Sequence, residues 1–310
     1  MNDYRVYRGA VVSQKIRNGI TTRQIEGSEK PNIVIFDVSY LAHRARWTTG
    51  YLEHEGMPTG VIYGTLNQIN RYRRIFPSNS IFVFAWDSLV SKRRSLYPNY
   101  KKQRIKERTE EEKAELADFY YQMSIMKQQV FEPIGFKNHI IESGYEADDG
   151  IASIVKSYAF DKRFEYIYIV SADSDLYQLL NTNVSMYSPK TESIYSIKSF
   201  ISEFGIIPDQ WIEALAIAGT HNDVKGVHGV GIATAVKYIV NVKVNPKKYN
   251  LITDFKASKD YKLNHRLIKL PFDNTILKPT AFDQFEFNRS GFRTVKRQFG
   301  FETLNEDEWI

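Results

Sequence analysis

Cysteine is absent from the 310-residue sequence. A chain without thiols has no disulfide, no thiolate zinc site and no cysteine nucleophile, and this composition suits a reducing compartment. The sequence also lacks any apolar run near the roughly 20 residues that a membrane-spanning helix needs. Residues 1–30 are polar and mixed in charge, unlike a signal peptide. We therefore expect a soluble protein of the cytoplasm, or of the host cytoplasm if a phage encodes it.

What the chain does contain is ample material for a core, since 43% of its residues are hydrophobic and 14% are aromatic. This length suits one large domain or two modest ones. The formal net charge is +6, and an excess of basic residues is a general feature of nucleic-acid-binding proteins. Much of this positive charge lies in one segment that also carries Tyr97 and Tyr100, which is typical of a nucleic-acid-binding surface. A solvated helix face is the alternative interpretation of this segment. Its basic residues are Lys92, Arg93, Arg94, Lys101, Lys102, Arg104, Lys106 and Arg108.

Three short apolar runs, each typical of a buried strand, are followed at once by acidic residues. In open α/β sheets, functional sites form at the carboxyl ends of the strands. The runs are 32–36, 81–86 and 166–170, and the acids after them are Asp37, Asp87, Asp173 and Asp175.

Helical patterns separate these strands, which predicts an α/β fold with a mostly parallel central sheet and helices on both faces. A hairpin or edge pair is expected at 184–187 and 193–197, and a short strand at 137–141. The predicted helices cover 39–46, 59–76, 109–130 and 146–158, the third beginning with a capping box at Thr109 and Glu112.

The stretch 144–152 places Glu146, Asp148 and Asp149 together at a helix start. Any one acid in these positions is more simply a helix cap or a surface residue. Several together repel each other unless cations bind, and oxygen ligands without thiols suit Mg²⁺ or Mn²⁺. This many carboxylates favour two ions, which about 4 Å apart activate water and stabilise the leaving oxygen in phosphodiester hydrolysis.

A second constellation is the glycine-rich turn at 226–231, between helical patterns at 208–219 and 232–240. Glycines let the turn's backbone approach a phosphate, with the next helix N-terminus facing it. Such a helix-hairpin-helix contacts the DNA backbone without reading sequence. A tight structural turn is the alternative.

In this order, the motifs resemble the structure-specific 5′-nucleases: flap endonucleases, the 5′-nuclease domain of bacterial DNA polymerase I, and the phage 5′-exonucleases and RNase H. The resemblance covers about residues 32–240. It rests on Ile35-Phe36-Asp37, Phe84-Ala85-Trp86-Asp87 with Arg93 and Tyr97-Pro98-Asn99-Tyr100-Lys101-Lys102-Gln103-Arg104, Gly144-Tyr145-Glu146-Ala147-Asp148-Asp149, Ser171-Ala172-Asp173-Ser174-Asp175 and the glycine-rich hairpin.

The resemblance implies a PIN-like nuclease core and two Mg²⁺ or Mn²⁺ ions, with K⁺ at the hairpin as a further candidate. Asp37, Asp87, Glu146, Asp148 and Asp173 would hold the catalytic ion, and Asp149, Asp175 and Asp223 would complete a second site. Lys101 and Arg104 would act with Asp37 and Asp173 in catalysis, in a helical arch over the ions. The implied DNA contacts are Arg93, Tyr100, which would stack on a base, Lys101, Arg104, Gly226, Gly229, Gly231 and Thr234.

One departure affects the second site. The family pattern G-D-x-x-D-N-[apolar]-P-G is replaced by Gly219-Thr220-His221-Asn222-Asp223-Val224-Lys225-Gly226, with Thr220 at the first acid and one residue fewer before the glycine. Asp223 is expected to retain the second acid's role, although a shifted register places Asn222 there. We expect His221 to be a surface loop residue, with assistance to the metal site as the alternative. We do not assign His43 a role near the substrate.

The predicted organisation is an N-terminal extension at 1–30, a nuclease core at 31–200 with the arch at about 90–132, a helix-hairpin-helix subdomain at 201–245 and a C-terminal segment at 246–310 that packs on the core. No polymerase or sliding-clamp peptide is expected to follow.

We predict a 5′-to-3′ exonuclease and 5′-flap endonuclease with RNase H activity, used in primer removal. Its partners would be DNA with single-stranded 5′ ends or flaps, RNA–DNA hybrid and single-stranded-DNA-binding protein, and it would be a monomer. The alternatives are a catalytically weak DNA-junction binding protein and a PIN-like ribonuclease.

Overall fold

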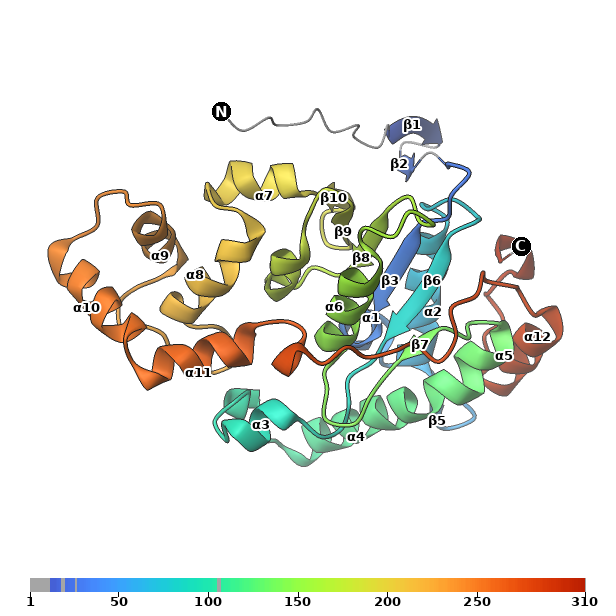
Figure 1. The fold of residues 1–310 in the computed structure, drawn as a ribbon. Helices are drawn as coiled ribbons and strands as arrows, with labels where there is room; N and C mark the ends of the chain where they lie inside the picture. The colour runs from blue at the N-terminus through green and yellow to red at the C-terminus, as the bar shows by residue number, and fades with distance from the viewer. Residues whose placement is uncertain (1–11, 18–19, 26, 105–106, 310) are drawn as a thin grey trace.

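A computed structural model describes residues 12–17, 20–25, 27–104 and 107–309. Its centre is a six-stranded sheet of order β10-β9-β8-β3-β6-β7 (Figure 1). All neighbouring pairs are parallel except β9 with β10, so the predicted mostly parallel sheet is confirmed. The strands are β3 (Ile33–Asp37), β6 (Ile81–Ala85), β7 (His139–Ile140), β8 (Ile167–Val170), β9 (Val184–Ser188) and β10 (Ser193–Tyr195).

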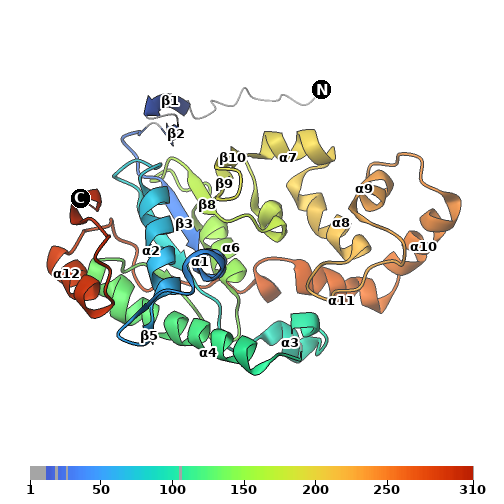
Figure 2. The ribbon, with the colours of Figure 1, turned by 180° about the vertical axis from the view of Figure 1, so that it is seen from behind.

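Successive residues of the central strands point into two separate cores, because side chains alternate across a sheet. Ile33 and Ile35 of β3 belong to the core beneath α6 (Ala147–Tyr158), whereas Val34 and Phe36 belong to the core beneath α1 (Val38–Thr49) and α2 (Gly60–Arg73). Figure 1 shows α6 in front of the sheet, and Figure 2 shows α1 and α2 covering the other face. Helices on both faces were predicted, and this is confirmed.

The segment between β6 and β7 runs along one side of the sheet as α3 (Lys92–Leu96), a 3₁₀ turn η1 (Lys102–Arg104), α4 (Glu110–Ile125), a π-helical stretch (Met126–Phe131) and α5 (Glu132–Ile134). The predicted capping box starts α4: the Thr109 hydroxyl accepts from Glu112 N–H, and the Glu112 carboxylate accepts from Thr109 N–H. The long helix expected at 109–130 is therefore present, with a change of helix type after Ile125.

A second group of helices lies beside the sheet on the side of α6 (Figure 1). The two helices expected around the glycine-rich turn are α8 and α9. The group consists of α7 (Ile197–Phe204), α8 (Trp211–Ala218), α9 (Ile232–Ile239), α10 (Pro246–Lys256) and α11 (Lys259–Ile268).

After α11 the chain returns across the sheet edge to α12 (Arg289–Gln298), which lies beside α5 (Figures 1 and 2). Trp309 is buried there between Phe136 of the nuclease core and Phe292 of α12. Trp309 thus connects the C-terminal segment, which was predicted to pack on the core, to Phe136 of that core.

Two small hairpins were not expected. Strands β1 (Val12–Arg17) and β2 (Ile20–Ile25) pair within the predicted N-terminal extension, for which no strand was expected. Residues 1–11 of that extension lie outside the described part of the chain. The dipeptide Asn18-Gly19 is a hairpin signal that could have revealed the pair. The other hairpin is β4 (Glu53–His54) with β5 (Met57–Pro58). Among the described residues, no helix has the length and apolar character to cross a bilayer.

Candidate metal and nucleic-acid site

The carboxyl ends of β3, β6 and β8 lie side by side, and the acids that follow them meet at this edge. Asp37 caps α1 by accepting a hydrogen bond from Tyr40 N–H at 3.0 Å, and its other oxygen accepts from the Ser171 hydroxyl at 2.9 Å. Asp87 accepts from Ala147 N–H at 2.8 Å, which ties the N-terminus of α6 to the same edge. The structure thus brings together the predicted acids of three strands and one helix.

These carboxylates influence one another strongly. Burial raises the pKa of Asp37 to about 7, and the charges of Asp87 and Asp173 contribute to the shift. Burial also raises the pKa of Asp148 well above its usual value, with further increases from Asp173 and Asp37. The charges of acids so placed are poorly compensated by the protein, which is the arrangement that a bound divalent cation relieves.

Asp175 lies at the far side of this edge. One of its oxygens, Oδ1, is buried and has no hydrogen-bond partner, while Oδ2 accepts from the Asn222 amide at 3.1 Å. Burial and the charge of Asp173 raise the pKa of Asp175 to about 6. Asp173, Asp175 and His221 each offer one ligand atom within 4.8 Å of the others. A buried, unpartnered carboxylate oxygen next to a second carboxylate and an imidazole fits a metal ion.

Asp149 is not part of this acid cluster, and its assignment as a metal ligand is wrong in this structure. Its side chain is fully buried, and its two oxygens accept from Arg93 Nη1 and Nη2 at 2.6 and 2.7 Å. Phe272 N–H donates to the same carboxylate at 2.7 Å. These contacts use both oxygens of Asp149 to hold α3 against α6 and the segment after α11.

Arg93 is correspondingly buried, with 2% of its surface exposed, so its assignment as a DNA contact is also wrong. Beyond Asp149, it donates to the Leu267 carbonyl at 2.9 Å and lies 3.5 Å from Glu146 Oε2. The sequence motif identified a constrained arginine, but a fully buried guanidinium cannot reach a phosphate on the surface.

Tyr100 was expected to stack on a base, and the structure corrects this as well. The ring is 4% exposed, and its hydroxyl donates to Glu146 Oε2 at 3.0 Å. Burial and the charge of Glu146 raise the pKa of Tyr100, so the phenol keeps its proton. Lys101 Nζ approaches the other oxygen, Glu146 Oε1, at 3.0 Å. Tyr100 therefore orients Glu146, and a ring buried in this way has no free face for a base.

The loop 220–224 decides between the two registers left open by the sequence. Asn222 is buried and faces Asp175, whereas the Asp223 carboxylate turns away and accepts from Gln103 N–H at 2.7 Å. Asp223 has a left-handed backbone with φ of 60°, which directs its side chain to η1. In this structure it is therefore Asn222, and not Asp223, that faces Asp175, as in the shifted register.

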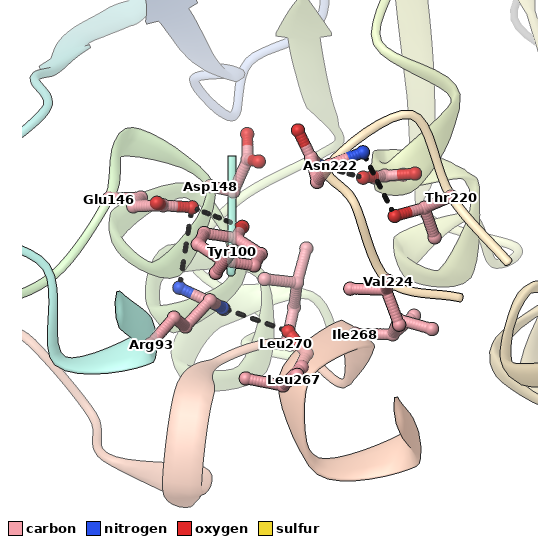
Figure 3. Close-up of a pocket in the computed structure, with 11 residues that line it drawn as sticks. Arg93, Tyr100, Glu146, Asp148, Thr220, Asn222, Val224, Leu267, Ile268 and Leu270 are labelled. Carbon is pink, nitrogen blue, oxygen red and sulfur yellow. Dashed lines mark hydrogen bonds and ion pairs between the residues drawn. The ribbon is translucent and has the colours of Figure 1, made fainter. Parts of the chain in front are cut away.

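A small cavity of about 10 Å³, with room for roughly one water molecule, separates the two halves of the site. Figure 3 shows Glu146 and Asp148 on one side of it, with Arg93 and Tyr100 next to Glu146, and Thr220 and Asn222 on the other side. Leu267, Ile268 and Leu270 close the cavity from the side of α11.

A larger cleft, of about 430 Å³, opens between the acids and the segment that contains η1 and α4. Asp87 and Glu146 lie on its acidic wall, and Phe119 and Tyr120 of α4 contribute aromatic rings. The cations that line this cleft are Arg94, Lys101, Arg104 and Arg108. Lys101 and Arg104 thus lie where the sequence placed them, beside the acids.

Residues 32–205, more than half of the chain, match the family model described as the 5′-3′ exonuclease N-terminal resolvase-like domain. The chain belongs to the 5′-3′ exonuclease family. Its similarity to individual members extends further, since a 5′-3′ exonuclease of Buchnera aphidicola is 28% identical over 268 residues, covering 86% of this chain and 84% of that protein. A 5′-3′ exonuclease of Aquifex aeolicus is 30% identical over 251 residues, 78% of this chain and 82% of that protein. The chain is therefore a nuclease, as predicted.

Other relatives are longer. The thermostable DNA polymerase I of Thermus thermophilus is 29% identical over 212 residues, which cover 68% of this chain but 24% of the polymerase. Among solved structures, the T5 5′-exonuclease with divalent metal ions (zinc) has a TM-score of 0.63 at 22% identity, covering 77% of this chain and 90% of that one. Flap endonuclease-1 from Methanococcus jannaschii has a TM-score of 0.54 at 16% identity and covers 90% of both chains. These likenesses confirm the predicted PIN-like fold.

The glycines of the hairpin in this 5′-3′ exonuclease have different roles. Gly226 packs directly on the end of α8, where a Cβ atom would lie 2.3 Å from the backbone of Ala218 and Gly219. Gly229 has φ of 71° and, like Gly231 at the start of α9, is exposed. Thr234, one turn into α9, is half-buried. Gly226 is explained by packing, and the exposed backbone at 229–231 remains the predicted DNA contact.

Sequence reasoning passed over several residues of this exonuclease's cleft. Arg94 and Arg108 belonged to the basic segment but received no role, and Phe119 and Tyr120 received none beyond lying in the helix predicted at 109–130. His43 stacks on Phe119 with ring centroids 4.6 Å apart and lines the same cleft. Interleaved basic and aromatic residues were the available signal, but which of them face the acids depends on how α4 packs.

Proposed function

We propose that this 5′-3′ exonuclease hydrolyses phosphodiesters near single-stranded 5′ ends of DNA, including 5′ flaps and RNA primers, with divalent metal ions. The observation that carries the proposal is the group of crowded, partly buried carboxylates opposite a cleft lined by cations. Acids that keep protons for want of a cation fit ion binding, and a basic cleft fits a phosphate backbone.

In this proposal, Asp37, Asp87, Asp148 and Asp173 hold one ion, and Glu146 supports it while Tyr100 and Lys101 orient its carboxylate. Such ions, when bound, activate a water molecule and neutralise charge on the scissile phosphate. Lys101 and Arg104 add positive charge from the cleft side and favour the more negative transition state.

Support for DNA as the substrate comes from proteins of the same fold. The T5 D15 flap endonuclease, at 23% identity, has been solved as a complex with DNA and metal ions. The catalytic core of Rad2, at 13% identity, has been solved in complex with a DNA substrate. Relatives that are DNA polymerases suggest a place in replication, where primer removal needs this chemistry. The same proposal includes Mg²⁺ as the ion and K⁺ at the hairpin. It also includes RNA–DNA hybrid as a substrate, single-stranded-DNA-binding protein as a partner and a monomeric state.

The test is cleavage of a 5′-labelled flap, compared with a nicked duplex and with RNA–DNA hybrid, in Mg²⁺, Mn²⁺ or EDTA. Asp173→Asn should lower the cleavage rate by about 10²–10³-fold, and EDTA should abolish it. Asp307→Asn, the same change at an exposed acid of the C-terminal turn η6 (Glu306–Glu308), is the matched control and should cleave normally. Cleavage that survives EDTA, or that Asp173→Asn leaves intact, would contradict the proposal. Tight flap binding without cleavage by the wild type would favour a junction-binding protein instead.

A further inference from the structure

His221 lies at the second half of the acid site, although its sequence context predicts a surface loop residue. Its ring offers a nitrogen within 4.8 Å of one carboxylate oxygen each from Asp173 and Asp175. These two acids are the pair at the end of β8, so a nitrogen ligand joins two oxygen ligands in one place.

The unpartnered oxygen of Asp175 is the second observation. Asp175 Oδ1 is buried and accepts no hydrogen bond, while its other oxygen is held by Asn222 Nδ2 at 3.1 Å. Leaving a buried carboxylate oxygen without a partner is costly, because the oxygen has given up its hydrogen bonds with water. A cation at this oxygen removes that cost, and it would lie within reach of His221.

The backbone that carries His221 is fixed from two sides. On one side, Gln103 Nε2 donates to the His221 carbonyl, and Lys101 N–H donates to the Asn222 carbonyl at 2.9 Å. On the other side, Asn222 N–H donates to the Thr220 hydroxyl at 3.2 Å. The imidazole therefore projects from a loop that hydrogen bonds within the protein hold in place.

Asn222 cannot replace a missing acid as a ligand in this arrangement. Arg104 Nη2 donates to its oxygen at 3.0 Å, so the amide nitrogen faces Asp175. Thr220 stands at the other position where the motif pattern has an acid. His221 is then the only metal-ligating side chain that the loop 220–224 directs at Asp173 and Asp175 among the described residues.

We propose that Asp173, Asp175 and His221 bind a divalent transition-metal ion through two oxygens and one nitrogen, and that the imidazole makes this site prefer such ions to Mg²⁺. Imidazole binds Co²⁺, Ni²⁺ or Zn²⁺ well, whereas Mg²⁺ takes oxygen ligands. The inference deepens the proposed function, on which it rests, by assigning a different ion preference to each half of the site.

The test is titration of the full-length protein with Co²⁺ and, separately, with Mg²⁺, by calorimetry and by NMR of the histidine rings without DNA. Co²⁺ should shift one of the six histidine ring signals strongly, and His221→Ala should remove that signal. The variant should also lose on the order of 10- to 100-fold in Co²⁺ affinity at one site and leave Mg²⁺ binding unchanged. His221→Asp should reverse the preference toward Mg²⁺. Because His221 is exposed, these variants should fold.

His228→Ala removes another exposed imidazole from the same subdomain and is the matched control for the metal titrations. Equal Co²⁺ affinity in wild type and His221→Ala, or no shifted ring signal, would overturn the inference. That result would leave the proposed function standing if EDTA still abolished cleavage and Asp173→Asn still slowed it by about 10²–10³-fold. Loss of cleavage dependence on any metal would instead contradict the proposed function itself.

Discussion

Arg93 and Asp149 form the most completely buried charge pair described in the site, with side-chain exposures of 2% and 0%. Two parallel hydrogen bonds satisfy the carboxylate, and the Leu267 carbonyl takes a third donor of the guanidinium. In the same site, Asp37 and Asp148 have no such cation. At the residue scale, aspartate therefore has two roles here. It forms a buried ion pair where an arginine reaches it, and it remains an uncompensated acid where none does.

We expect Arg93→Ala to lower the free energy of unfolding by about 3–5 kcal/mol, because it leaves Asp149 buried and unpaired. The neighbouring Arg94 is exposed and lines the cleft, so Arg94→Ala should change stability by less than about 0.5 kcal/mol. Urea denaturation measures both. If Arg93→Ala were as stable as Arg94→Ala and lost only DNA affinity, Arg93 would be a DNA contact after all.

Asp37 gives the opposite effect on stability. Its pKa is raised from 3.8 to about 7 in the folded protein, so between these pH values the folded state binds more protons than the unfolded state. Its contribution to stability is therefore present below about pH 4 and is lost as the pH rises through 7. In EDTA at pH 8, Asp37→Asn should melt a few degrees above the wild type, and the difference should vanish near pH 4.

Thermal melts across this pH range, with and without Mg²⁺, provide the measurement. Because ligands stabilise the state that binds them, Mg²⁺ should raise the melting temperature of the wild type more than that of Asp37→Asn. A variant less stable than the wild type at pH 8 in EDTA would show that the Asp37 charge is compensated without metal.

At the scale of elements, the 3₁₀ turn η1 and the loop 220–224 form one unit although more than 100 residues separate them. Gln103 N–H reaches Asp223, and Arg104 reaches Asn222. The loop thereby positions the segment that carries Lys101 and Arg104 over the cleft, and the same loop presents His221 to the acids. Hydrogen bonds thus connect the cations of the cleft to the second half of the acid site.

Asp223 distinguishes positioning from metal ligation. Asp223→Asn keeps the oxygen that accepts from Gln103 N–H, so cleavage should stay within a few fold of the wild type, whereas Asp173→Asn loses about 10²–10³-fold. Asp223→Ala removes the acceptor, and amide exchange at Gln103 should become about tenfold faster. Flap cleavage assays and hydrogen exchange test both statements. A loss in Asp223→Asn as large as in Asp173→Asn would restore Asp223 as a ligand.

At the scale of the whole molecule, the C-terminal segment completes the core on the face of α1 and α2. Trp309 is 1% exposed and packs on Phe136, Phe292 and the Arg73 guanidinium, whose carbon lies 5.3 Å from the ring. Arg73 also donates to the Glu308 carbonyl at 2.7 Å. The nuclease core and the end of the chain therefore stabilise each other.

Trp309→Ala should cost about 3–5 kcal/mol of unfolding free energy, as expected for a buried tryptophan. Trp47, at the end of α1, is 79% exposed, and Trp47→Ala should change stability by less than about 0.5 kcal/mol. Denaturant unfolding of the two variants supplies the comparison. Equal stabilities would mean that the C-terminal segment folds against the core without stabilising it.

The sequence by itself determined the α/β fold and the edge at which the acids gather. Apolar runs of strand length, helical periods between them and an acid directly after each run are local patterns, and in parallel sheets they lead to one arrangement. For this reason Asp37, Asp87 and Asp173 were predicted to lie at one edge, and in the structure the charges of Asp87 and Asp173 act on Asp37.

Only the tertiary structure decided which polar residues face that edge. Arg93 and Asp149 are 56 residues apart and pair because α3 packs against α6, which turns a motif arginine and a motif acid into core residues. Between His221, Asn222 and Asp223, the left-handed backbone at Asp223 and its contact with Gln103 decided the outcome. Local sequence fixes neither, because desolvation and hydrogen bonding between distant segments are properties of the packed chain.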